Sequence, residues 1–328
     1  MAASSRQRAF FLKKYFRRYR INTKYYSPDQ GGSKLELGLF YLRILIKVGP
    51  NDIIFCQRTV YNFPLSVLII SFVVLFNRKL VFDFDDAIYL HAPITTTLFT
   101  KVARAVIVGS HSLYDWSVKH NKHVYIVPTC VDVEDYRVRK IRRNKTQVIG
   151  WNGSAPGQIE NLRLLVPVFK KLLTQKLAFK VVLIGVVGRR EVYDMFQSIS
   201  GLEVTFIDRI AWEDPKVIAS HLSKFDIGLN PLVDNELNRG KCAFKAIEYM
   251  ATGVPTICSA VGENKYLIKN GENGFLVNDL NEWVEKIEQL ANSDKLRKKL
   301  GKAGQKTVED NYSYEAIIPK LVGILSNC

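Results

Sequence analysis

Short apolar runs alternate with longer stretches of helical periodicity along the whole chain. In the first half, strands are predicted over residues 52–57, 80–84, 105–109 and 124–127. Helices are predicted between them, over 64–76 and 113–119. Because short apolar strands that alternate with helices form parallel sheets through right-handed βαβ units, this half predicts an α/β domain.

The same alternation restarts in the second half. Strands are predicted over residues 148–151, 180–185, 204–207, 225–230 and 254–260. Helices are predicted over 159–173, 243–251, 282–290, 294–301 and 314–325. With 328 residues and 47% hydrophobic composition, the chain can fill two cores. We therefore expect two doubly wound domains, 1–136 and 147–328, joined by an exposed basic linker over 137–146 that contains RVRKIRRNK.

Phe63–Phe76, FPLSVLIISFVVLF, is the most apolar run of the chain. It is shorter than the ~20 residues that a membrane-spanning helix needs. A buried helix between two strands is the favoured interpretation, and a shallow membrane contact is the alternative.

The basic charge is concentrated near the start of the chain. The net charge is +16, and residues 1–25 hold eight Lys or Arg and no acid. Within residues 6–20, aromatic pairs alternate with Lys13–Lys14 and Arg17–Arg18, as in a basic amphipathic helix. Such a helix suits an anionic membrane surface, although its apolar side may equally pack on the first domain. Nucleic acid is an unlikely partner, because the chain shows no zinc-finger spacing, RNP-type strand or helix-turn-helix.

The cysteines and histidines give no sign of a metal site. Five cysteines show no CxxC spacing, and the five histidines form no HxxxH or HExxH pattern. An odd number of cysteines without a signal peptide favours a reducing, cytoplasmic location.

The segment 239–277 carries the clearest candidate chemistry. A helix over 243–251 would place Lys241, Lys245 and Glu248 along one face, and Gly253 would end that helix. Gly262 follows the next strand at once. Two lysines suit a diphosphate and a carboxylate suits a ribose diol, although an ordinary solvated helix face has the same charges.

Other polar residues follow the predicted strands, where doubly wound domains bind ligands. They are Asp83, Asp85 and Asp86, then Ser110, then Asn152, Gly153 and Ser154, then Gly185 and Asn230. Any one of them may instead be a turn or cap residue, and Ser110 is expected to cap a helix. The three aspartates would repel one another unless a ligand or cation lies between them.

These motifs resemble glycosyltransferase family 4, the group 1 sugar transferases. The resemblance rests on FDFDDAIY, VGSHSLYDW and VPTCVDVEDY in the first half, and on IGWNGSAPGQIENL, IEYMATGVP, SAVGENKYLI and NGENGFLV in the second. Within that family, the chain is similar to the subgroup with an Asp-Asp-Ala motif and a Gly-Lys-Cys segment, which here precedes Lys245 and Glu248. The family has a Glu where Gly240 stands here, and it has an opening strand before a segment like Ser5–Arg8.

The resemblance implies a GT-B fold, which is two facing Rossmann-like domains, here with the first apparently lacking its opening strand. It also implies that the last helix crosses back to the first domain. The donor would be a nucleotide-diphosphate sugar, with no cofactor and no metal. The expected donor-binding residues are Gly153, Ser154, Lys241, Lys245, Glu248, Val261, Gly262, Glu263 and Asn264, with Arg239 as a further diphosphate contact.

The expected function is retaining transfer of a sugar to a saccharide or lipid-linked acceptor in the synthesis of a bacterial envelope polysaccharide, lipopolysaccharide or capsule. Asp85 and Asp86 are the candidates for orienting the acceptor. The protein is expected on the cytoplasmic face of the membrane. A non-catalytic nucleotide-sugar or polysaccharide-binding protein and a nucleotide-sugar epimerase of the same fold are the alternatives.

Overall fold

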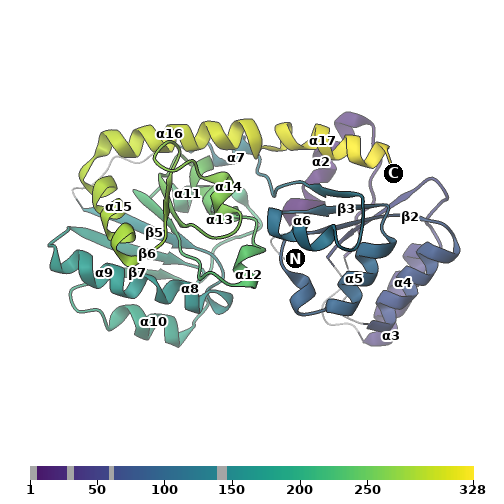
Figure 1. Cartoon of the computed structure of the whole chain (residues 1–328), viewed down its shortest axis with the longest axis horizontal. Helices are drawn as coiled ribbons and strands as arrows, with labels where there is room; N and C mark the ends of the chain where they lie inside the picture. Colours follow the sequence, from purple (N-terminus) through teal and green to yellow (C-terminus); the bar gives the residue numbers. More distant parts are fainter. Residues whose placement is uncertain (1–5, 28–32, 59–62, 139–145) are drawn as a thin grey trace. The chain divides into compact units, whose positions relative to one another are not determined.

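The computed structural model describes residues 6–27, 33–58, 63–138 and 146–328, and it divides into two compact units (Figure 1). The first unit comprises Met1–Thr129, Gly240–Cys242 and Ile317–Cys328. The second comprises Cys130–Arg239 and Ala243–Ala316. The chain thus passes between the units at 129–130, before the basic run, whose residues 139–145 lie outside the described residues.

The first unit is built on a four-stranded parallel sheet with the strand order β1-β2-β3-β4. Its strands are β1 (Ile53–Gln57), β2 (Lys79–Phe84), β3 (Ala105–Val108) and β4 (Val124–Ile126). Its main helices are α2 (Leu12–Phe16), α3 (Lys34–Leu45), α4 (Phe63–Leu75), α5 (Pro93–Val102) and α6 (His111–Ser117). The described residues ahead of β1 contain no strand, so β1 is the outer strand of the sheet described here.

The segment predicted as one amphipathic helix over residues 6–20 forms three short turns instead. A π-helical turn over Arg6–Phe10 and a 3-10 turn over Arg17–Tyr19 flank α2. The apolar side chains Leu12, Tyr15 and Phe16 are buried. The apolar side of this segment therefore packs within the first unit, which was the alternative to membrane docking.

The second unit has a six-stranded parallel sheet with the order β10-β9-β8-β5-β6-β7. The strands are β5 (Gln147–Asn152), β6 (Phe179–Ile184), β7 (Val204–Ile207), β8 (Ile227–Asn230), β9 (Thr256–Ser259) and β10 (Phe275–Val277). Successive strands are added on one side of β5 and then on the other, so the order reverses between β5 and β8. A reversal of this kind creates the crevice in which doubly wound domains bind their ligands.

Helices cover both faces of this sheet (Figure 1). Ile149 and Trp151 of β5 belong to one apolar cluster with α9 and α15, whereas Val148 packs on the other cluster with α11 and α13. The helices are α7 (Val133–Tyr136), α8 (Ile159–Arg163), α9 (Leu165–Thr174), α10 (Arg190–Gln197), α11 (Pro215–Leu222), α12 (Glu236–Arg239), α13 (Phe244–Ala251), α14 (Asn264–Leu267), α15 (Leu280–Asn292) and α16 (Asp294–Asn311). The last helix, α17 (Tyr314–Ser326), begins in the second unit and continues into the first.

Most predicted helices have somewhat different bounds in the structure, for example 280–292 instead of 282–290. The helix predicted over 159–173 is divided into α8 and α9 at Leu164. The helix predicted to end at Gly301 continues to Asn311. Gly301 lies inside this helix and allows it to pack closely on Gly253, because a Cβ at Gly301 would lie 2.3 Å from the Gly253 carbonyl oxygen. Finally, α13 begins at Phe244, because Ala243 has a left-handed backbone with φ of 56°.

Candidate functional site

The residues that gather at the reversal point of the second sheet centre on Glu248 of α13. This side chain is only 4% exposed. Its Oε1 accepts a hydrogen bond from the Tyr136 hydroxyl at 2.9 Å, and its Oε2 accepts one from Asn152 Nδ2 at 3.0 Å. These two partners fix the orientation of the Glu248 carboxylate.

Tyr136 and Tyr249 complete the frame around this carboxylate. Burial, reinforced by the neighbouring Glu248, raises the pKa of Tyr136 well above its ordinary value, so the phenol stays a donor. The Tyr249 hydroxyl accepts from the backbone N–H of Asn152 at 2.9 Å and donates to the Leu229 carbonyl at 3.3 Å. The ends of β5 and β8 are thereby tied to α13.

Two polar atoms of β5 are buried beside this frame without a hydrogen-bond partner among the described residues. They are the indole Nε1 of Trp151 and the amide Oδ1 of Asn152. An unpaired buried donor or acceptor costs roughly 1–3 kcal/mol, so such atoms are unusual away from ligand sites.

Lys245 lies over the end of β5. Its ammonium is 5.8 Å from the centroid of the Trp151 ring. A Cβ on Gly153 would come within 2.5 Å of the Lys245 Cε, so glycine is required where the lysine stem crosses. Gly185 packs closely on Gly153, because a Cβ at Gly185 would be 1.7 Å from the Gly153 carbonyl oxygen. The structure thus brings Lys245 and Gly153 together, and the exposed Ser154 comes next in the chain.

Lys241 does not share the helix face that the sequence predicts for it. It precedes the left-handed Ala243 and belongs, with Gly240 and Cys242, to the first unit. There the Ser110 hydroxyl donates to the Gly240 carbonyl at 3.1 Å, and it also accepts from the Leu113 N–H, which confirms Ser110 as a helix cap. The prediction of one face with Lys241, Lys245 and Glu248 is therefore wrong.

The loop after β9 contains four of the predicted donor-binding residues. Gly262, with φ of 53°, lets this loop approach the backbone of Arg239, because a Cβ there would lie 2.6 Å from the Arg239 carbonyl oxygen. Val261 and Glu263 are buried. The Asn264 side chain donates to the Ser259 carbonyl and accepts from Asn230, so it joins the ends of β8 and β9.

Arg239, expected as a further diphosphate contact, pairs with Asp234. Its Nε and Nη2 donate to the two carboxylate oxygens at 2.6 and 3.0 Å. Both side chains are more than half exposed, so solvent screens this ion pair and Asp234 holds the arginine only weakly.

The three aspartates of the first unit have cation partners that the sequence pattern did not identify. Arg8 is buried; it donates to both oxygens of Asp83 and to the Val127 carbonyl at 2.7 Å. Arg58 pairs with Asp86 and lies 3.5 Å from Asp85 Oδ1. Burial, followed by the charge of Asp86, raises the pKa of Asp85 to about 7. The repulsion expected among these carboxylates is thus relieved by arginines and by protonation.

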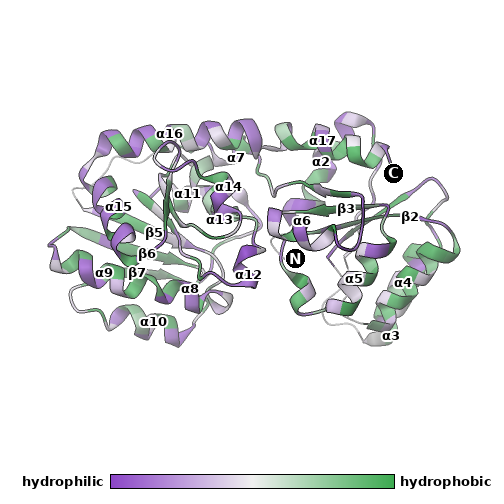
Figure 2. Cartoon of the chain, in the orientation of Figure 1, coloured by the Kyte–Doolittle hydropathy of each residue, from purple (hydrophilic) through white to green (hydrophobic). Residues whose placement is uncertain are grey.

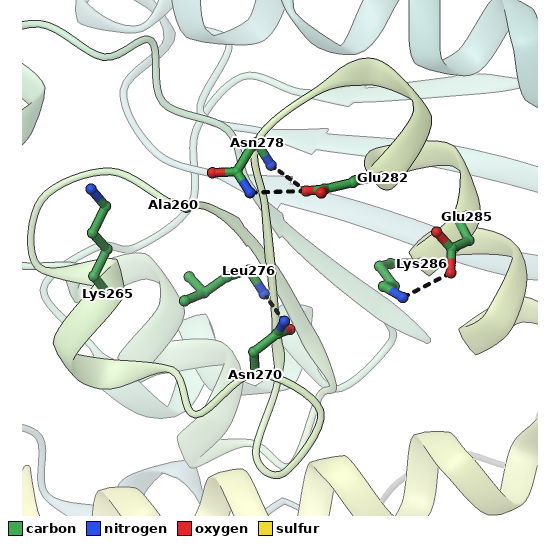
Figure 3. Close-up of a pocket in the computed structure, with 8 residues that line it drawn as sticks. All are labelled: Ala260, Lys265, Asn270, Leu276, Asn278, Glu282, Glu285 and Lys286. Carbon is green, nitrogen blue, oxygen red and sulfur yellow. Dashed lines mark hydrogen bonds and ion pairs between the residues drawn. The ribbon is translucent and has the colours of Figure 1, made fainter.

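A separate hollow lies beside the edge strand β10 (Figure 3). Two side chains occupy the outward N–H groups of this strand: Asn270 Oδ1 accepts from Leu276 at 3.1 Å, and Glu282 Oε2 accepts from Asn278 at 2.6 Å. This edge is therefore closed to a further strand. None of the predicted site residues lines the hollow; its lining is Ala260, Lys265, Asn270, Leu276, Asn278, Glu282, Glu285 and Lys286.

The second unit matches a known family. Residues 146–293 match the family model described as "Glycosyl transferases group 1". Among curated proteins, the chain is 31% identical over 80 residues to spore coat protein SA of Bacillus subtilis. It is 38% identical over 78 residues to the capsular polysaccharide biosynthesis glycosyltransferase CapM of Staphylococcus aureus. These alignments cover 24% and 23% of this chain but only 21% and 20% of the relatives, about a fifth of their length.

Solved structures extend the similarity over both units. HepE of Anabaena in complex with UDP-glucose superimposes with a TM-score of 0.70 and 13% identity, over 97% of this chain and 89% of that one. Sucrose-phosphate synthase of Thermosynechococcus elongatus gives 0.69 and 18% identity, over 92% and 80%. The predicted fold is thereby confirmed: two parallel-sheet α/β domains of the GT-B type.

Proposed function

We propose that this protein is a retaining glycosyltransferase of family 4. It transfers a sugar from a nucleotide-diphosphate sugar to a saccharide or lipid-linked acceptor in the synthesis of a cell-envelope polysaccharide. The observation that carries the proposal is the arrangement of Glu248, Asn152 and Lys245 at the reversal point of the second sheet. The match of residues 146–293 to group 1 glycosyl transferases supports it.

In this proposal, Glu248 binds the ribose. Its carboxylate is held in place by Tyr136 and Asn152 and accepts hydrogen bonds from the ribose diol. The unpaired Trp151 Nε1 and Asn152 Oδ1 are the further atoms that a bound nucleotide would satisfy after a small movement of the lysine above them.

Lys245 carries most of the diphosphate charge. When the sugar leaves, negative charge develops on the diphosphate, and a preorganised ammonium stabilises it. Gly153 and Gly262 let the diphosphate approach the backbone closely, and the Ser154 hydroxyl supplies a neutral donor. Arg239 adds a second cation once the diphosphate replaces Asp234. The remaining proposed contacts are Lys241, Val261, Glu263 and Asn264.

We assign Asp85 and Asp86 to acceptor orientation. The acceptor oxygen bonds to the anomeric carbon from the face from which the diphosphate leaves, so the configuration is kept, and the acceptor hydroxyl loses its proton to the departing phosphate. Because lysine and backbone groups supply the positive charge, the reaction proceeds without a metal, and transfer should be unchanged by EDTA. Loss of transfer that Mg²⁺ or Mn²⁺ restores would contradict this part.

The protein is proposed to act on the cytoplasmic side of an anionic membrane. In the segment 6–20, Lys13, Lys14, Arg17 and Arg18 are exposed, whereas the neighbouring aromatics Tyr15 and Phe16 are buried. This segment can therefore attract a membrane chiefly through charge, because Phe10 and Tyr19 are its only exposed aromatic side chains. None of the helices in the described ranges has the length and apolar content that crossing a bilayer requires.

A transfer assay tests the proposed function. A panel of nucleotide sugars is first screened for donors that raise the melting temperature, since a ligand that binds the native state stabilises it. The best donor is then supplied with a radiolabelled sugar and a lipid-linked saccharide extract. We expect transfer by the native protein and at least a tenfold loss in Lys245→Ala, with Lys216→Ala as the matched control. Donor binding without transfer or hydrolysis would instead favour a non-catalytic binding protein.

A further inference from the structure

Helices α3 and α4 of the first unit present an unusual apolar surface to solvent. More than half of the large apolar side chains that are exposed in the described part of the chain lie on these two helices or at their ends. Figure 2 shows both helices as predominantly hydrophobic on the outer side of the first unit. We call this surface the α3–α4 face: Leu35, Leu39, Leu42 and Ile46 from α3 and its end, and Phe63, Val67, Leu68, Val74, Leu75 and Phe76 from α4 and its end.

The exposed side of α3 is a continuous stripe. Leu35, Leu39, Leu42 and Ile46 are spaced by four, three and four residues, which aligns them on one side of the helix. Leu35 is 73% exposed and Ile46 is 71% exposed. Helix α3 contacts α4 through Gly38, which faces Leu65 and, by helical spacing, lies beside this stripe. The exposure of its side chains shows that the stripe faces solvent and not the core of the unit.

The exposed side of α4 is equally apolar. No charged residue occurs from Phe63 to Phe76. One side of α4 packs inward through Leu65, Ile69 and Val73. The other side exposes Val74 at 60% and Leu75 at 78%. A helix that is hydrophobic all round is normally covered by protein or lipid.

The charge around the α3–α4 face indicates what covers it. Arg43 and Lys47 are exposed and, by helical spacing, lie beside the α3 stripe on the side away from α4. Arg78 and Lys79 come three and four residues after the end of α4 and are half-buried. An apolar strip bordered by cations matches the interface of an anionic bilayer, where side chains insert and lysines and arginines remain at the headgroups. A second copy with the same +16 charge would be repelled.

We propose that the α3–α4 face docks on an anionic lipid bilayer, with α3 and α4 lying in the interface plane. This inference deepens the proposed membrane association and supplies most of its apolar component, because only Phe10 and Tyr19 among the aromatics of residues 6–20 are exposed. Charge and apolar insertion together provide the two signals that lasting attachment to a bilayer needs.

Vesicle sedimentation tests the proposal. The purified full chain is mixed with vesicles of phosphatidylcholine, with or without phosphatidylglycerol. We compare the native protein with an α4 variant (Val67→Gln, Val74→Gln, Leu75→Gln) and an α3 variant (Leu35→Gln, Leu39→Gln). The matched control carries Leu164→Gln and Leu280→Gln, which are exposed in the second unit. Circular dichroism confirms that each variant is folded.

We expect the native protein and the control to bind the anionic vesicles, and each face variant to lose at least about tenfold in partition. Binding that is unchanged in both face variants would overturn the proposal. So would a concentration-dependent dimer, seen by sedimentation velocity and abolished in the α4 variant, because the face would then be a subunit interface. Calorimetry with UDP on the same variants keeps the two proposals separate. The face variants should bind UDP with the affinity of the native protein. Failure of the native protein to bind UDP would contradict the donor site and not the membrane contact.

Discussion

Glu248 owes its orientation to two hydrogen bonds that come from outside its own helix. Tyr136 contributes one from α7 and Asn152 the other from the end of β5. Because the carboxylate is buried, losing either partner leaves acceptor capacity unsatisfied in a region that water reaches poorly. The position of the proposed ribose ligand is therefore set by residues that need not touch the ligand.

Replacing Tyr136 with Phe tests this dependence. The substitution removes the hydroxyl that donates to Glu248, and we expect the free energy of unfolding to fall by about 1–3 kcal/mol. Tyr193→Phe is the control, because the Tyr193 hydroxyl donates to the exposed Asp208 and its loss should destabilise the protein less. Urea unfolding of both variants measures the difference. Equal losses would show that the bond to Glu248 is not special.

Asp85 gives the first unit a pH-dependent stability. Its pKa is raised from 3.8 to about 7, first by burial and then by Asp86. In the folded protein Asp85 keeps its proton to about pH 7, whereas the unfolded chain releases it near pH 4. The resulting stabilisation is complete at low pH and is lost as the pH rises through 7.

Asp85→Asn should remove this loss. Between pH 5 and pH 8 we expect the native unfolding free energy to fall by about 1–3 kcal/mol relative to the variant, since each unit of pKa shift is worth about 1.4 kcal/mol. Urea unfolding at both pH values provides the measurement. Parallel pH profiles for the two proteins would refute the raised pKa.

At the scale of elements, the approach of β5 and β6 shapes the proposed diphosphate site. Gly153 follows β5 and Gly185 follows β6, and the two backbones leave no room for a side chain. This contact places Gly153 beneath the Lys245 stem. The glycines are therefore steric requirements of the site and not merely loop residues.

Gly185→Ala should be strongly destabilising. Its Cβ would meet the Gly153 carbonyl oxygen at 1.7 Å, and we expect a loss of more than about 3 kcal/mol in unfolding free energy, or failure to fold. Gly188→Ala is a matched control: φ there is also positive, at 65°, but the added Cβ meets nothing within 4 Å. The control should lose only about 1 kcal/mol. Similar losses in the two variants would contradict the close approach.

The apolar strands could be predicted from the sequence because a buried parallel strand is an almost uninterrupted apolar run. The helices were harder to predict. Helices as short as α10 and α11, with eight residues each, give little periodic signal, and they were missed. Gly301 suggested a helix end, yet it lies inside α16, where close packing on Gly253 requires it. Sequence spacing does not distinguish a glycine that ends a helix from one that lets a neighbour approach.

The candidate site shows the same limit. Lys245 and Gly153 come together as expected, but Lys241 is not on the same helix as Lys245, because α13 begins only after the left-handed Ala243. The partners of buried charges were also hidden: Tyr136 lies far from Glu248 in sequence, and Arg8 lies far from Asp83. Such pairs depend on tertiary contacts that no local pattern encodes.

At the scale of the whole molecule, the chain combines a GT-B fold with a large positive charge and one apolar face. The net charge of +16 attracts both an anionic donor and an anionic membrane. The second unit holds the proposed donor site, and the first unit carries the α3–α4 face. The two proposals therefore rest on different units and can be tested separately.

Calorimetric titration with UDP tests the central claim most directly. We expect UDP to bind the native protein and to bind at least tenfold more weakly to Glu248→Gln and to Lys245→Gln, a loss of about 1.4 kcal/mol or more in each. Glu248→Gln preserves the shape of the side chain, and Asn152 can turn its amide to accept from the new Gln. Lys216→Gln, in α11, should bind as the native protein does. Native affinity in both site variants, or no UDP binding by the native protein, would contradict the proposed donor site.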